Sequence, residues 1–333
     1  MTIAVVPEGS EFLVNTDVSA DQTFPRITWL TNGGFAVTWG SGSGIKAQVF
    51  DATGAKVGTE FLVNAQPGQW PVISGLAKGG FVLTWAGDYL HTTDVWAQLF
   101  DGTGERVGGE FLVNTRSGNY QFTADTTSLN DGGFVVAWRY DGGNADNSGI
   151  AVQIFDVTGA KVGAEVLVKQ AEVHSTPSVT GLSDGGFVLT WLEGYSSACT
   201  VKAQVFDATG VKVGDELLVN THPVDWQGVP DVTALSDGTF VIVWNESSNV
   251  HGQVCDATGA KIGAEFLVTT QVEGGQGDPH VTALVNGAFV VTWIDSSAER
   301  YSDLKAQVFD ATGGCRLAIQ HRWRHDLDQR QRR

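Results

Sequence analysis

The side chains best suited to chemistry in this sequence are five ionisable residues: Asp125, Asp231, His174, His280 and Arg26. Four of them follow directly after the proline position of a recurring strand-like pattern, and His174 comes three residues before that position in its own repeat. Two carboxylates and two imidazoles could hold a divalent cation or serve as general acid and base. The alternative interpretation is a set of unrelated polar residues lining a water-filled channel.

A second set consists of amide side chains three residues before the same proline position, with aromatic residues beside them. The polar members are Gln22, Gln121, His174, Gln227 and Gln276, with Gln69 one residue out of step, and the aromatic neighbours are Trp70, Tyr120 and Trp226. Amides next to flat rings suit sugar hydroxyls and ring faces, which predicts a ligand-binding rim. The alternative is that each glutamine hydrogen-bonds the backbone of its own repeat.

One loop offers oxygen ligands for Ca²⁺. The stretch "DGGNADNSG" at 141–149 supplies Asp141, Asn144, Asp146 and Ser148 as candidate metal ligands, in the manner of the first half of a calcium loop. The downstream bidentate glutamate of such loops is missing. Ca²⁺ is therefore the one cofactor with a partial site here, and the alternative is an ordinary polar loop.

The elements that must position these residues are six copies of one unit. The string "GGF-x-x-x-W", with its glycine pair altered in two copies, ends at Trp39, Trp85, Trp138, Trp191, Trp244 and Trp293. Each unit contains four strand-length segments separated by turn residues, and a period of this length is typical of propellers or solenoids. In the turn "DATG", Asp can bond the amides ahead of it and Gly accepts a left-handed conformation. A glutamine in every third segment, such as Gln48, is expected to make a structural hydrogen bond.

The repeat predicts an all-β chain that folds as a six-bladed β-propeller of four-stranded antiparallel blades over residues 1–314. The second segment is apolar on both faces, as a strand sandwiched between two sheets must be. The sixth copy lacks the "EFLVN" segment, and an orphan copy stands at residues 11–15. We therefore expect the N-terminal strand to complete the last blade and close the ring.

The tail 315–333 departs from the repeat and is basic, which predicts a disordered or aberrant segment.

Composition narrows the function classes. The net charge of −17 disfavours nucleic acid as a partner, and no apolar run is long enough for membrane insertion. The N-terminus lacks the pattern of a conventional signal peptide. Three cysteines without paired spacing give no disulfide framework, and Cys255 occupies a phenylalanine position of the repeat, where it should pack as a small hydrophobe. The loops between second and third segments differ in every unit, so a site is expected on that face.

The consensus "P-x-V-T-x-L-x-D-G-G-F-V-V-T-W … K-A-Q-V-F-D-A-T-G-x-K-V-G-x-E-F-L-V-N" resembles repeats of large secreted bacterial proteins, many of them adhesins or RTX-associated. The resemblance implies an extracellular or cell-surface location, although the calcium-binding nonapeptides of RTX proteins are absent. The main hypothesis is a monomeric, non-catalytic binding propeller that recognises a glycan or another cell-surface ligand. The alternative is a metal-dependent hydrolase, lactonase- or esterase-like, with Asp125, Asp231, His174 and His280 at the channel mouth. A structural spacer is a third hypothesis.

Overall fold

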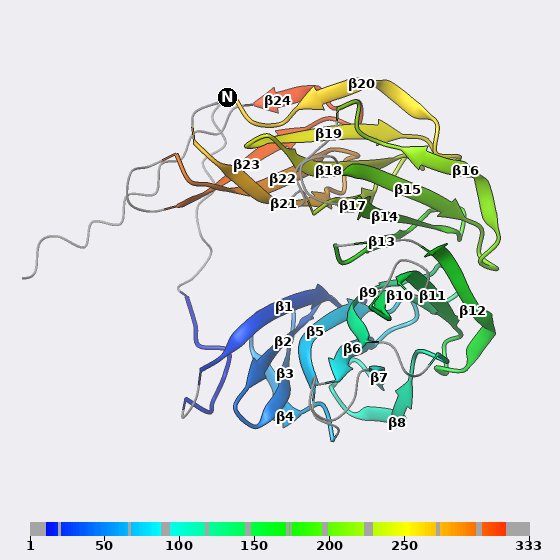
Figure 1. The fold of residues 1–333 in the computed structure, drawn as a ribbon. Coiled ribbons are helices and arrows are strands. Elements are labelled where there is room, and N and C mark those ends of the chain that lie inside the picture. Colours follow the sequence, from blue (N-terminus) through cyan, green and yellow to red (C-terminus); the bar gives the residue numbers. More distant parts are fainter. Residues whose placement is uncertain are drawn as a thin grey trace, which may run out of the picture.

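The structure is a computed structural model that describes residues 11–18, 21–65, 68–87, 94–116, 120–143, 148–170, 173, 175–194, 199–222, 229–270, 274–297 and 302–317. These residues form strands, turns and loops, arranged as six four-stranded antiparallel sheets that follow one another around a ring (Figure 1). The prediction of an all-β, six-bladed propeller is confirmed. In the described part of the chain, no helix is long and apolar enough to cross a membrane.

Each blade is built from four consecutive strands, and the first strand of each blade is called its inner strand below. The first two blades contain β1 (Thr23–Trp29), β2 (Phe35–Ser41), β3 (Gly44–Phe50), β4 (Lys56–Leu62), β5 (Gly68–Gly75), β6 (Phe81–Gly87), β7 (Val95–Phe100) and β8 (Arg106–Leu112). The third and fourth contain β9 (Tyr120–Ser128), β10 (Phe134–Asp141), β11 (Gly149–Phe155), β12 (Lys161–Gln170), β13 (Ser178–Gly181), β14 (Phe187–Glu193), β15 (Thr200–Phe206) and β16 (Lys212–Leu218). The last two contain β17 (Asp231–Ala234), β18 (Phe240–Glu246), β19 (Asn249–Cys255), β20 (Lys261–Leu267), β21 (Gln276–Ala283), β22 (Phe289–Asp295), β23 (Asp303–Phe309) and β24 (Cys315–Leu317).

The inner strands pack in sequence, β1 on β5, then β9, β13, β17 and β21. The core lies between the blades, where the second strands are buried on both faces, as in β6, every residue of which is buried. A phenylalanine pair ties the second strand to the third in five of the blades, for example Phe134 and Phe155 with ring centroids 4.9 Å apart. In the fifth blade Cys255 takes this place and is fully buried, which confirms its packing as a small hydrophobe.

The repeated turn acts as predicted. The Asp51 carboxylate accepts the N–H groups of Thr53 at 2.8 Å and Ala55 at 3.0 Å. Gly54 adopts φ +81°, a left-handed conformation that suits glycine. The glutamine of the third strand is structural, since the Gln48 amide donates to the carbonyls of Val49 and Val57.

A glutamate in the fourth strand joins neighbouring blades. The Glu165 carboxylate accepts the backbone N–H of Thr115, which belongs to the preceding blade, at 2.7 Å. Glu265 accepts the N–H of Thr221 in the same way at 3.0 Å. The repeated "EFLVN" segment therefore links consecutive blades, because its glutamate satisfies amides that follow the outer strand of the blade before it.

The two ends of the chain differ from the prediction. Residues 11–15 form no strand, and β24 supplies the fourth strand of the sixth blade by pairing with β23. The expected completion of that blade by residues 11–15 is therefore wrong, as is the expectation that the whole tail from 315 is disordered or aberrant. The turn at Asp310 returns the chain directly to β23, and a short hairpin costs far less loop-closure entropy than recruiting the distant N-terminus.

Residues 11–17 dock instead on the first blade. Phe12 packs against Phe50 with ring centroids 5.5 Å apart, just as Phe61 of the first blade packs against Phe100 of the second at 5.2 Å. The N–H of Thr16 donates to Glu60 at 2.6 Å. The orphan segment therefore makes, on the first blade, the contacts that an outer strand makes on the blade that follows it.

Candidate functional site

The ionisable residues singled out by spacing share one register position on the inner strands. Asp125, Asp231 and His280 face Ala137, Val243 and Thr292 of their second strands, and Arg26 faces Thr38. Ser178 has the same position in the fourth blade. The propeller thus gathers side chains from distant parts of the sequence around its axis. We call Arg26, Asp125, Ser178, Asp231 and His280 the inner-strand cluster.

Asp231 lies at the centre of this cluster. Its Oδ1 accepts the Ser178 hydroxyl at 2.9 Å and the N–H of Val232 at 3.0 Å. Its Oδ2 accepts the N–H of Val281 at 2.9 Å and lies 3.4 Å from Nδ1 of His280. Four polar partners from three blades hold this carboxylate, so its position is fixed.

Asp125 has a different electrostatic setting. Its oxygens accept the N–H groups of Thr126 at 2.9 Å and Val179 at 2.8 Å. Burial raises the pKa of Asp125 to about 6, the negative charge of Asp231 adds to this effect, and the two amides and Arg26 oppose it. A carboxyl group with this pKa changes its charge near neutral pH, which suits acid–base chemistry.

The His280 side chain is exposed, and its pKa is shifted in the same direction as that of Asp125. Its hydrogen bond to the Asp231 carboxylate raises the pKa of His280 above its ordinary value, and the charges of Asp231 and Asp278 act in the same direction. Burial and Arg26 oppose the shift. The carboxylate of Asp231 thus favours the protonated form of the His280 ring.

The predicted amide rim is used for structure instead. Nε1 of Trp138 donates to Gln121, and Nε1 of Trp293 donates to Gln276, both at 2.7 Å. Both glutamines are buried. The carbonyl oxygens of Gln121 and Gln276, both predicted to bind ligand, thus accept hydrogen bonds from indole N–H groups of the blade core.

The remaining rim residues do not form one surface with these glutamines. Gln69 is exposed, and Gly68 occupies the place beside Trp85 that glutamine has in other blades. Gln22 and Trp70 are half-buried, and Tyr120 is exposed. His174, Trp226 and Gln227 lie outside the described residues.

The predicted calcium loop is described only in part, since Asn144 and Asp146 lie outside the described residues. Asp141 accepts the Ser148 hydroxyl at 2.9 Å and the N–H of Gly143 at 2.8 Å. Its other oxygen lies 2.9 Å from the Arg139 guanidinium. Asp141 and Ser148, the two candidate metal ligands that the structure describes, are thus hydrogen-bonded to each other within the loop.

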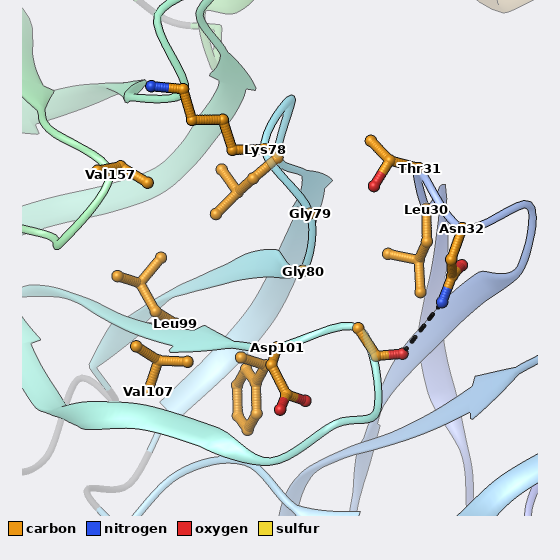
Figure 2. Close-up of a pocket in the computed structure, with 13 residues that line it drawn as sticks. Leu30, Thr31, Asn32, Lys78, Gly79, Gly80, Leu99, Asp101, Val107 and Val157 are labelled. Carbon is orange, nitrogen blue, oxygen red and sulfur yellow. Dashed lines mark hydrogen bonds between the residues drawn. The ribbon is translucent and has the colours of Figure 1, made fainter.

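A pocket of about 320 Å³ lies near the repeated turns of the first two blades (Figure 2). Leu30, Leu99, Val107 and Val157 give it an aliphatic wall, and Lys78 and Asp101 are its charged residues. Asn32 closes one side by donating to the carbonyl of Gly102 at 3.5 Å. None of the inner-strand cluster residues lines this pocket, so it is separate from the chemistry described above.

Comparison of the sequence with protein-family profiles and with curated proteins gives no match. Solved structures show the same fold. The α-L-arabinofuranosidase Arb93a from Fusarium graminearum, in complex with an iminosugar inhibitor, is 13% identical with a TM-score of 0.58, over 90% of this chain and 96% of that chain. A protein of unknown function from Dyadobacter fermentans is 11% identical with a TM-score of 0.53, over 89% and 96%. A puromycin hydrolase variant is 14% identical with a TM-score of 0.56, over 89% of this chain but 46% of that one.

These findings correct the main functional hypothesis. The non-catalytic binding propeller was inferred from an amide rim, and the buried members of that rim hold tryptophans. The similar propellers with a stated activity are hydrolases, and the inner-strand cluster has the acid–base groups of the alternative hypothesis. At these identities the likeness shows the fold alone: the chain is a six-bladed propeller similar to those of hydrolases.

Proposed function

We propose that this propeller is a hydrolase of O-glycosides whose reaction takes place at the inner-strand cluster. The observation that carries the proposal is that a carboxyl group and an imidazole, at the same register position of two inner strands, both have pKa values raised above their ordinary values. Asp125, with a pKa raised to about 6, is ionised at neutral pH yet basic enough to take a proton. The hydrogen bond with Asp231 raises the pKa of His280 and so favours the protonated imidazole that a general acid requires.

The proposed step uses Asp125 as general base and His280 as general acid. Asp125 belongs to the third blade and His280 to the sixth, at the same register position of their inner strands. Asp125 takes a proton from a water molecule as its oxygen attacks the anomeric carbon. The bond from this carbon to the leaving oxygen breaks, and His280 gives that oxygen its proton. The products are a free sugar and an alcohol, and both catalytic groups then exchange protons with water.

Asp231 is a positioning residue in this scheme. Its contacts with Ser178, Val232 and Val281 fix the carboxylate, which in turn orients the His280 ring. The half-buried Trp70 and the exposed Tyr120 offer aromatic faces suited to sugar rings. The arabinofuranosidase activity named for a similar propeller supports the choice of glycosides, and arabinosides are the first substrates to test. We also propose an extracellular location, supported by the likeness to secreted repeats.

The proposal is tested by release of the aryl alcohol from a panel of 4-nitrophenyl glycosides that includes α-L-arabinofuranoside, with 4-nitrophenyl acetate as an ester comparison. We expect glycoside cleavage by the wild type and a decrease of about 10²- to 10⁴-fold in Asp125→Asn and His280→Ala. Val211→Thr, at an exposed position in the turn between β15 and β16, is the control and should retain activity. Cleavage of the ester alone, or equal glycoside cleavage in all four proteins, would contradict the proposal.

A further inference from the structure

The boundary between the fourth and fifth blades holds a cluster of imidazoles and carboxylates that is separate from the inner strands. Ligand atoms of His222, Glu246 and Glu265 all lie within 4.8 Å of one another. His251 joins them, with its Nδ1 2.9 Å from Oε1 of Glu265. The two carboxylates are largely buried, with side-chain exposures of 11% and 10%, and the His222 side chain is exposed. The cluster is thus open to solvent on the side of one imidazole.

At the boundary between the third and fourth blades, lysine side chains neutralise the equivalent pair of carboxylates. In the fourth blade Glu193 and Glu216 occupy the positions of Glu246 and Glu265, at the end of the second strand and in the fourth strand. Lys202, at the strand position of His251, lies 3.0 Å from Glu216. Lys169 of the preceding blade lies 3.1 Å from Glu193 and 3.2 Å from Glu216. Two fixed ammonium groups thus neutralise the same pair of glutamates.

The first blade gives a second comparison. Lys46, again at the position of His251, lies 2.7 Å from Glu60 and 3.0 Å from Asp17. The fifth blade differs from both, because its carboxylates face two histidines and imidazole is neutral unless protonated. In the part of the chain that the structure describes, no lysine or arginine forms a salt bridge with Glu246 or Glu265. Two largely buried carboxylates without such a cation are costly, and a bound divalent ion would supply the missing charge.

We propose that the boundary between the fourth and fifth blades binds one divalent transition-metal ion of the Zn²⁺ type through His222, Glu246 and Glu265. Imidazole nitrogen and carboxylate oxygen are ordinary ligands of Zn²⁺, and three protein ligands leave a position for water. His251 positions Glu265 from behind, as second-layer partners of metal ligands commonly do. Thr221 holds the other oxygen of Glu265 through its N–H and hydroxyl groups at 3.0 and 2.9 Å.

The test is titration of the full chain with ZnCl₂ by isothermal calorimetry after dialysis against a chelator. CoCl₂ in a parallel titration provides a spectroscopic readout through visible d–d absorption. The key variant is His222→Lys with His251→Lys, which places two ammonium groups beside the same carboxylates, as two lysines do in the fourth blade, and should preserve folding. His280→Ala is the control that keeps this cluster and alters only the inner strands.

We expect one Zn²⁺ per wild-type chain, a raised midpoint of thermal unfolding with Zn²⁺, and the Co²⁺ absorption band. The double lysine variant should lose all three responses with an unchanged circular dichroism spectrum, and His280→Ala should retain them. If the lysine variant does not fold, His222→Ala provides the same comparison at an exposed position. Absence of Zn²⁺ binding to the wild type, or equal binding to the variants that lack His222, would overturn the proposal.

Discussion

Nδ1 of His280 lies 3.4 Å from Oδ2 of Asp231, and the two residues come from consecutive inner strands of the propeller. The hydrogen bond with this carboxylate is the main reason that the pKa of His280 is raised. In Asp231→Asn the fixed negative charge disappears, so the pKa of His280 should fall below its wild-type value. The ¹H NMR titration of the His280 ring measures this directly. An unchanged titration in the variant would show that Asp231 does not control His280.

The raised pKa of Asp125 should make the free energy of unfolding decrease as the pH rises. Its pKa is raised from 3.8 to about 6, so the folded chain binds more protons at this site than the unfolded chain between these values. The contribution of Asp125 to stability is therefore present below about pH 4 and lost as the pH rises through about 6. Urea unfolding of the wild type and Asp125→Asn at several pH values provides the measurement. As the pH rises from about 4 to about 6, the free energy of unfolding of the wild type should fall relative to that of Asp125→Asn. A difference between the two proteins that does not change with pH would contradict the raised pKa of Asp125.

The glutamines that accept hydrogen bonds from Trp138 and Trp293 should matter for stability. Gln121→Leu removes the acceptor of the buried Trp138 N–H, and an unsatisfied buried donor costs about 1–3 kcal/mol. Gln69→Leu changes an exposed residue and should alter the free energy of unfolding by less than about 0.5 kcal/mol. Chemical denaturation of both variants tests the difference. Equal effects would mean that the bond from Trp138 to Gln121 contributes nothing.

The short last strand can be tested by two truncations. Deleting residues 318–333 leaves β24 intact, whereas deleting 315–333 removes it and its pairing with Val308 and Phe309. The second truncation should lower the free energy of unfolding below that of the first by about 1 kcal/mol, the order of a few cross-strand pairs. If the two proteins unfold at the same denaturant concentration, β24 does not contribute to the sixth blade.

The internal repeat was sufficient to predict the six four-stranded blades and their turns. Every strand boundary in the repeat is marked by local chemistry, such as Asp51 and Gly54 in the turn. The last strand was missed because "CRL" has no likeness to "EFLVN". A hairpin there depends on backbone pairing after the turn rather than on side-chain pattern.

Sequence reasoning could find the site residues that share one repeat position, but it could not find contacts that depend on how the strands and blades pack. Asp125, Asp231 and His280 could be found because they share one repeat position. The role of Gln121 could not be read from spacing, since it depends on the indole that reaches it across the blade. His222 and Glu265 come from different blades, and their proximity to Glu246 follows only from the packing of the two sheets.

The pH dependence of kcat/KM for an aryl arabinofuranoside, measured in the wild type and in Asp231→Asn, tests the central claim most directly. We predict a bell-shaped profile whose acid limb lies near pH 6, because Asp125 must be ionised, and whose basic limb lies higher, because His280 must be protonated. In Asp231→Asn the basic limb should move to lower pH as the pKa of His280 falls. A wild-type profile without these limbs, a basic limb unmoved in the variant, or no turnover by the wild type would contradict catalysis by this cluster.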